Sequence, residues 1–206
     1  GLRGGDTVLL GVSGGLSSKA LLHLLRRYLN DNPGRPCRGR VDFSLAAVRV
    51  AGPDEASGGG AASALDAACG ASRLGVPLLV VPLALVFCCP RDLARAVTEA
   101  LGDERSGAAF WRQEPVVLAI PAREEDARRL RALLDSLGGD DTAREDLEEI
   151  LRTRLLLEVG RALGANRLAL GHCASALAVR AFCDVAKARG YSLPAGIQYW
   201  DDRHAG

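Results

Sequence analysis

The chain has 206 residues, of which 48% are hydrophobic and 25% are charged, and its formal net charge at pH 7 is +1. This composition is typical of a soluble globular domain. The near-neutral charge excludes a global attraction to nucleic acid and allows only a local basic patch. No apolar run approaches the ~20 residues of a membrane-spanning helix.

An apolar run over residues 7–12 predicts a buried strand, and leucines at helical spacing after it predict a helix that opens near Ser17. Glycines between the two let an anion approach the backbone, and the first helical turn directs N–H groups and its positive dipole end toward that anion. A plain turn without a ligand is the alternative. We expect a phosphate site made of Ser13, Gly14, Gly15, Ser17 and Ser18.

Further strands are predicted over 41–50 and 78–85, with a loop over 52–60 and a helix over 61–74 between them. Helices are predicted over 91–101 and 123–137, whereas 116–120, between two prolines, is too short to assign. Strands that alternate with helices predict a parallel sheet. The segment from about 88 to 142 is a candidate helical insertion.

A long helix is predicted from Ala143 to a C-terminal Gly164, followed by a strand over 167–170 and a helix over 177–188. Gly171 and His172 open this second strand-to-helix turn, although a lone histidine there is more often structural. The fold class expected is α/β, with a doubly wound, mostly parallel five-stranded sheet in the order 3-2-1-4-5. Gly14 and Gly171 should then lie at the carboxyl ends of adjacent strands.

The cysteines contain no C-x-x-C pair, so they provide no metal or redox motif. We expect each to be a buried free thiol in a reducing intracellular compartment, with Cys88 and Cys89 at a strand end. The six are Cys37, Cys69, Cys88, Cys89, Cys173 and Cys183.

Both turns resemble motifs of one superfamily. Ser13-Gly14-Gly15-Leu16-Ser17-Ser18 is similar to the S-G-G-x-D-S loop of PP-loop ATP pyrophosphatases, and Gly171-His172 to the G-H-N-x-D-D motif of tRNA sulfurtransferases. The chain as a whole, from Gly4 to Asp202, resembles the cytoplasmic tRNA 2-thiolation protein 2 family. Further stretches carry this resemblance: Arg144-Glu145-Asp146-Leu147, Arg152-Thr153-Arg154-Leu155-Leu156-Leu157 and Gly190-Tyr191-Ser192-Leu193-Pro194.

The resemblance implies a single PP-loop-like domain over 1–206, belonging to the adenine nucleotide alpha hydrolase-like superfamily and forming a fragment of a longer chain. Active relatives hold Mg²⁺ with carboxylates, but Ser17, Ser175 and Ala176 occupy those positions here. The C-x-x-C motif of active relatives aligns with Glu145 to Glu148, which contains no thiol. We therefore expect no catalytic residue and no metal site, while ATP binding stays open. The degenerate nucleotide or phosphate site would comprise Ser13, Gly14, Gly15, Ser17, Ser18, Gly171 and His172.

The function implied is that of a non-catalytic, cytoplasmic subunit that pairs with a PP-loop thiolase and supports 2-thiolation of the wobble uridine in tRNA. A ubiquitin-related sulfur carrier would act through that partner, and no membrane is involved. One alternative is an independent ATP-dependent enzyme that adenylates tRNA, of the thiolase or lysidine-type synthetase kind. Another is a structural or nucleotide-sensing module.

Overall fold

The computed structural model describes residues 2–30, 42–53, 70–71, 73–101, 110–111 and 116–197. The chain divides into two compact units, residues 1–170 and 171–206, and each unit is described by itself. None of the helices in these ranges is long and apolar enough to cross a membrane.

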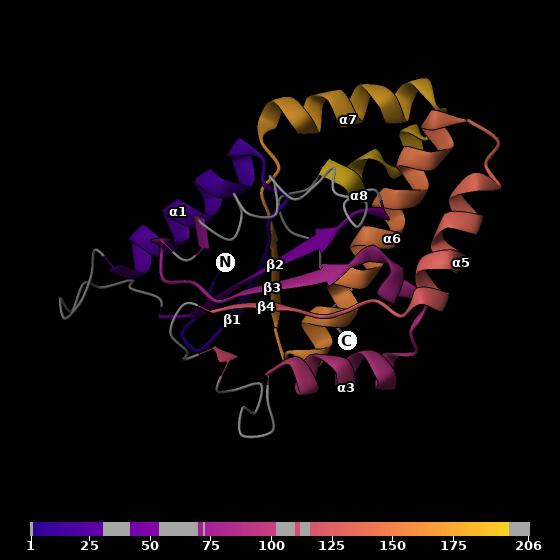
Figure 1. Ribbon diagram of the computed structural model, residues 1–206. Helices are drawn as coiled ribbons and strands as arrows, with labels where there is room; N and C mark the ends of the chain where they lie inside the picture. The colour runs from indigo at the N-terminus through magenta and orange to yellow at the C-terminus, as the bar shows by residue number, and fades with distance from the viewer. Residues whose placement is uncertain are drawn as a thin grey trace. The chain divides into compact units, whose positions relative to one another are not determined.

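The first unit contains a five-stranded sheet in which every pairing is parallel (Figure 1). The prediction of an α/β fold with a parallel sheet is confirmed, as is the adjacency of the first three strands. The order is β4-β3-β2-β1-β5. The strands are β1 (Thr7–Gly11), β2 (Ser44–Ala51), β3 (Leu78–Pro82), β4 (Val117–Ala119) and β5 (Arg167–Leu170).

The predicted order 3-2-1-4-5 is wrong for the fourth strand, which lies beside β3 at the edge of the sheet. β4 has only three residues, is partly exposed and is soon followed by Pro121. Because proline cannot donate a ladder hydrogen bond, such a segment suits an edge. The place beside β1 is taken by β5, with Gly11 opposite Leu170.

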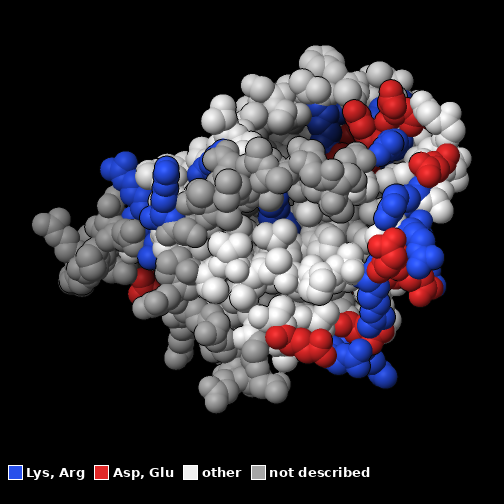
Figure 2. All heavy atoms as spheres, viewed as in Figure 1, with Lys and Arg blue, Asp and Glu red and all other residues white. Residues whose placement is uncertain are grey.

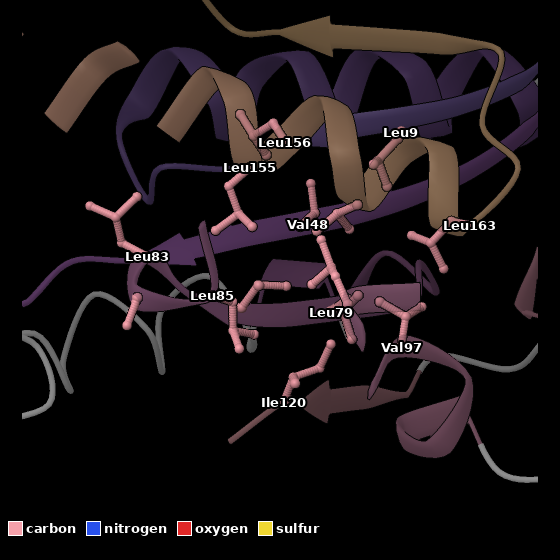
Figure 3. Packing of buried hydrophobic residues seen from close by; sticks show 14 of the residues in the cluster. Leu9, Val48, Leu79, Leu83, Leu85, Val97, Ile120, Leu155, Leu156 and Leu163 are labelled. Atoms are coloured by element: carbon pink, nitrogen blue, oxygen red, sulfur yellow. The ribbon is translucent and has the colours of Figure 1, made fainter. Parts of the chain in front are cut away.

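Helices cover both faces of this sheet, as predicted. Side chains alternate along each strand, so Val8 and Leu10 pack in the layer that contains Leu22 of α1 (Leu16–Asn30). Leu9 and Val48 pack on the opposite face with Leu155 of α6 (Asp141–Ala162), as Figure 3 shows. That second layer also includes α3 (Pro90–Leu101) and α5 (Glu124–Asp135).

The third predicted strand is too long, because β3 ends at Pro82 and Leu83–Phe87 forms the 3₁₀ helix η2. Cys88 and Cys89 consequently lie between η2 and α3, and their predicted place at a strand end is wrong. The long helix, by contrast, is confirmed. Gly164, just beyond it, has φ +70°, as expected of a glycine that ends a helix. Most of the helix predicted over 61–74 lies outside the described residues, and of the four that are described Gly70, Ala71 and Arg73 are helical.

The second unit contains α7 (Ala174–Ala186), the 3₁₀ helix η3 (Gly190–Ser192) and α8 (Leu193–Ile197). α7 confirms the helix predicted there and begins three residues earlier. None of its described side chains is buried, and Val179, Phe182 and Val185 are exposed. The assignments of a single domain and of an insertion over about 88–142 stay predictions, although Leu93, Ile120 and Leu130 of that segment are buried in the core.

Candidate functional site: the turn between β1 and α1

The candidate site is the turn that leads from β1 into α1 at the carboxyl edge of the sheet. Gly14 has φ +87°, a backbone conformation that side chains rarely adopt, so glycine is required there. Gly15 is different, because its φ is ordinary and, among the described residues, a Cβ added there would meet only the Ser13 hydroxyl, at 3.5 Å. Within the part of the chain that the structure describes, no side chain other than that of Ser13 lies within 4 Å of this position.

The two outer serines hold this turn together. Ser18, which is buried, donates its hydroxyl hydrogen to the Gly15 carbonyl at 3.0 Å. The 3.3 Å contact between the hydroxyls of Ser13 and Ser18 then has Ser13 as donor, because Ser18 has no second hydrogen. Ser13 Oγ also accepts the Gly15 N–H, at 3.4 Å. These hydroxyls stabilise the turn itself, so they are less available to a phosphate than the sequence predicted.

Ser17 occupies the position that the resemblance assigns to a carboxylate. Its side chain is half-buried in the first turn of α1, and no described residue accepts or donates a hydrogen bond at its hydroxyl. A serine hydroxyl can donate to a phosphate oxygen, but it supplies no negative charge to Mg²⁺. In the described part of the chain, no three His, Cys, Asp or Glu side chains are grouped so that they could hold a metal ion.

Arg49 is a residue of this site that was not predicted from the sequence. It lies near the carboxyl end of β2 with a side chain only 2% exposed, and its Nη1 donates to the Ser13 carbonyl at 2.9 Å. The guanidinium places a buried positive charge under the turn, which favours an anion above it. The sequence feature that could have identified Arg49 is its charge, because it is the one charged residue in the otherwise apolar stretch 45–50.

Gly171 and His172, the other predicted site residues, lie in the second unit. Gly171 is half-buried, His172 is exposed and Cys173 is the N-cap of α7, where its side chain makes no capping hydrogen bond. The strands that precede the two turns, β1 and β5, are neighbours as predicted. That the two turns form one site stays a prediction.

The thiols differ from the expectation of buried cysteines. Cys89, Cys173 and Cys183 are exposed, while Cys37 and Cys69 lie outside the described residues. Cys88 is half-buried, and its thiol donates to the Asp126 carboxylate at 3.4 Å. Burial and this hydrogen bond raise the pKa of Cys88 to about 11, so it is a poor nucleophile at neutral pH.

Comparison with known proteins links the chain to one group of proteins. It is 31% identical over 195 residues to "Cytoplasmic tRNA 2-thiolation protein 2" of Phaeosphaeria nodorum, a match that covers 91% of this chain and 43% of the relative. The proteins of the same name from Arabidopsis thaliana and Oryza sativa subsp. indica are 48% identical over 90 residues and 44% identical over 80 residues. These two matches cover 43% and 39% of this chain, and 19% and 17% of the relatives.

The matched region is therefore less than half the length of each of these relatives. No protein-family model matches the chain, and no solved structure matches it either. The assignment of the fold to the PP-loop class accordingly stays a prediction. The sequence matches show that this chain is a homologue of the proteins named cytoplasmic tRNA 2-thiolation protein 2, within a region shorter than half of their length.

Proposed function

We propose that the protein is a non-catalytic subunit in cytosolic tRNA 2-thiolation, which supports a separate PP-loop thiolase in forming 2-thiouridine at the wobble position. The homology carries this proposal, because each relative is named for tRNA 2-thiolation and for the cytoplasm. A ubiquitin-related sulfur carrier would deliver sulfur through the thiolase partner, and tRNA would be the shared substrate.

The chemistry of the turn supports the non-catalytic part of this proposal. Adenylation of a uridine by ATP needs a metal ion to offset phosphate charge, and oxygen anions are the ligands that Mg²⁺ prefers. The turn offers hydroxyls, N–H groups and the buried charge of Arg49, with Ser17 at the carboxylate position. This set could hold a phosphate group as a bound ligand while leaving it unactivated.

A two-part experiment tests the proposal with the full-length protein. In cells that lack their own copy, it should restore 2-thiouridine in tRNA, measured by mass spectrometry of tRNA nucleosides. Purified alone with ATP, Mg²⁺ and unmodified tRNA, it should release no pyrophosphate.

Failure to restore 2-thiouridine would contradict the role in thiolation. Pyrophosphate release by the protein alone, lost in Ser17→Ala, would instead support the independent adenylating enzyme. Ser17 suits this test better than Ser18, because the Ser18 hydroxyl holds the turn and its loss would disturb the fold.

A further inference from the structure

The helix α1 differs from the other charged helices of the first unit because it has no acidic side chain. Its 15 residues include Lys19, His23, Arg26 and Arg27 and contain no Asp or Glu. The first turn of α5, by contrast, contains Glu124, Glu125 and Asp126. Figure 2 shows the same contrast: blue atoms gather where Figure 1 places α1, while red and blue mix over α5 and α6.

Three of these residues lie along one face of the helix. Lys19, His23 and Arg27 follow one another at intervals of four, so their side chains are neighbours on the surface. His23 and Arg27 are exposed and Lys19 is half-exposed. At a rise of about 1.5 Å per residue, this row is about 12 Å long, which is enough to face several phosphates of a nucleic-acid backbone.

Helix stability explains only part of this pattern. Arg27 in the last turn interacts favourably with the negative end of the helix dipole. Lys19 lies near the opposite end, where the dipole disfavours a cation by about 0.3–1 kcal/mol. The helix dipole therefore does not account for a lysine at this position.

The positive surface extends beyond α1 to the segment before β3. The Arg26 guanidinium lies against Gly75, with Nη2 3.1 Å from the position that a Cβ there would take. Arg73, two residues earlier, is exposed. We use the name α1 basic face for Lys19, His23, Arg26, Arg27 and Arg73.

We propose that the α1 basic face binds the phosphate backbone of the tRNA substrate. The identification of the polyanion as tRNA rests on the proposed function, whereas the location of the face rests on charge complementarity. Phosphate contacts of this kind position an RNA without reading its sequence. The net charge of +1 is no obstacle, because counterion release depends on local contacts.

A protein partner is the competing occupant, because Leu16 and Leu24 are exposed beside the basic row. We favour RNA since the side chains of the face carry charge of one sign, and the flat side of a base can pack on leucine. Binding of tRNA and co-purification with the thiolase, measured separately, distinguish the two occupants.

The experiment measures binding of full-length protein to an unmodified tRNA transcript by fluorescence anisotropy over a series of salt concentrations. The variant Lys19→Gln/Arg27→Gln should bind about 50- to 100-fold more weakly at 0.1 M salt, and the slope of log K against log salt should fall by about 2. The control Arg128→Gln/Arg131→Gln removes two exposed charges from α5 and should change neither quantity. Thermal melting of each variant checks that the fold is intact.

Wild-type affinity and slope in the α1 variant, or no binding of tRNA by the wild type, would overturn the inference. Loss of co-purification with the thiolase partner, with tRNA binding unchanged, would also overturn it and make this face a protein interface. The proposed function is measured separately, as 2-thiouridine in cells. If the wild type fails to restore 2-thiouridine but the α1 variant still binds tRNA more weakly than the wild type does, the proposed function is contradicted. The inference that the α1 basic face binds tRNA would then stand.

Discussion

Replacing Gly15 by aspartate tests whether the turn between β1 and α1 is an anion site. Gly15 precedes the first residue of α1, and its carbonyl accepts the Lys19 N–H at 3.2 Å, so it is the N-cap of the helix. Its φ is ordinary, and the nearest heavy atom to an added Cβ would be the Ser13 hydroxyl at 3.5 Å. The new side chain therefore needs no strained backbone and meets no close contact among the described residues.

The substitution should raise stability. An aspartate at an N-cap is better than glycine by a few tenths of a kcal/mol, and its charge adds about 0.3–1 kcal/mol at the helix N-terminus. Gly15→Asp should therefore increase the free energy of unfolding by about 0.5–1 kcal/mol. Gly15→Asn should gain only the capping part. Gly14→Ala should instead lose about 1–2 kcal/mol, because φ at Gly14 is +87°.

The same substitution should weaken binding of an anion. Two charges of the same sign about 4 Å apart repel by about 1 kcal/mol in water and about 4 kcal/mol near a protein surface. This corresponds to a loss of affinity between about fivefold and several hundredfold. Gly15→Asn keeps the size and the capping oxygen without the charge, so it should retain most of the affinity.

The assays are chemical denaturation for stability, equilibrium dialysis with labelled ATP for binding, and the 2-thiouridine content of tRNA in cells for function. A more stable protein that binds less ATP and supports less thiolation is the expected result for Gly15→Asp. The anion-site interpretation is refuted if Gly15→Asp and Gly15→Asn behave alike in binding and thiolation, or if the wild type itself binds no ATP.

Three further predictions concern the rest of the first unit. Gly160→Ala in α6 should raise the free energy of unfolding by about 0.5–1 kcal/mol in denaturation, because the new Cβ would meet Leu9 at an ordinary 3.7 Å and alanine favours helix. The pKa of Asp6 is lowered from 3.8, chiefly by the hydrogen bond that the Arg3 N–H donates to its carboxylate, so ionised Asp6 stabilises the fold above pH 3.8. In denaturation at a series of pH values, the advantage of wild type over Asp6→Asn should disappear as the pH falls through the lowered pKa of Asp6. At pH 8, peptide mapping should find Cys88 alkylated about a hundredfold more slowly than an ordinary exposed thiol, because the pKa of Cys88 is about 11. Asp126→Asn should speed the alkylation of Cys88, and equal rates in the wild type and the variant would contradict the role of the Asp126 carboxylate.

Hydrophobic periodicity was sufficient to predict most of the fold, because local sequence determines which face of an element is apolar. β1, β5, α6 and the glycine after α6 all follow from such patterns. The place of β4 could not be predicted in this way. Its three residues carry no clear period, and its neighbour is decided by long-range pairing with β3. The early end of β3 at Pro82 was likewise missed, since the apolar run continues into η2 without a change in composition.

The candidate site was predictable only where its chemistry lies in one short stretch. Ser13 to Ser18 were found because glycines and serines between a strand and a helix form a local signal. Arg49 is 36 residues from Ser13 in sequence, and only the pairing of β1 with β2 brings its guanidinium under the turn. The roles of the two outer serines also required coordinates, because composition does not say whether a hydroxyl faces a ligand or its own backbone.

The internal bonding of the turn bears on how a degenerate phosphate loop should be interpreted. Ser13 and Ser18 bond to each other and to Gly15, and Arg49 bonds to the Ser13 carbonyl, so the turn keeps its shape without any ligand. A well-formed glycine turn is therefore no evidence that ATP binds in this protein. The charge at one position is the better criterion, because Gly15→Asp and Gly15→Asn would share the same shape and differ only in their effect on an anion. If that difference is large, the turn still binds a phosphate; if it is absent, the turn is a structural remnant, and any contact with tRNA must come from surfaces such as the α1 basic face.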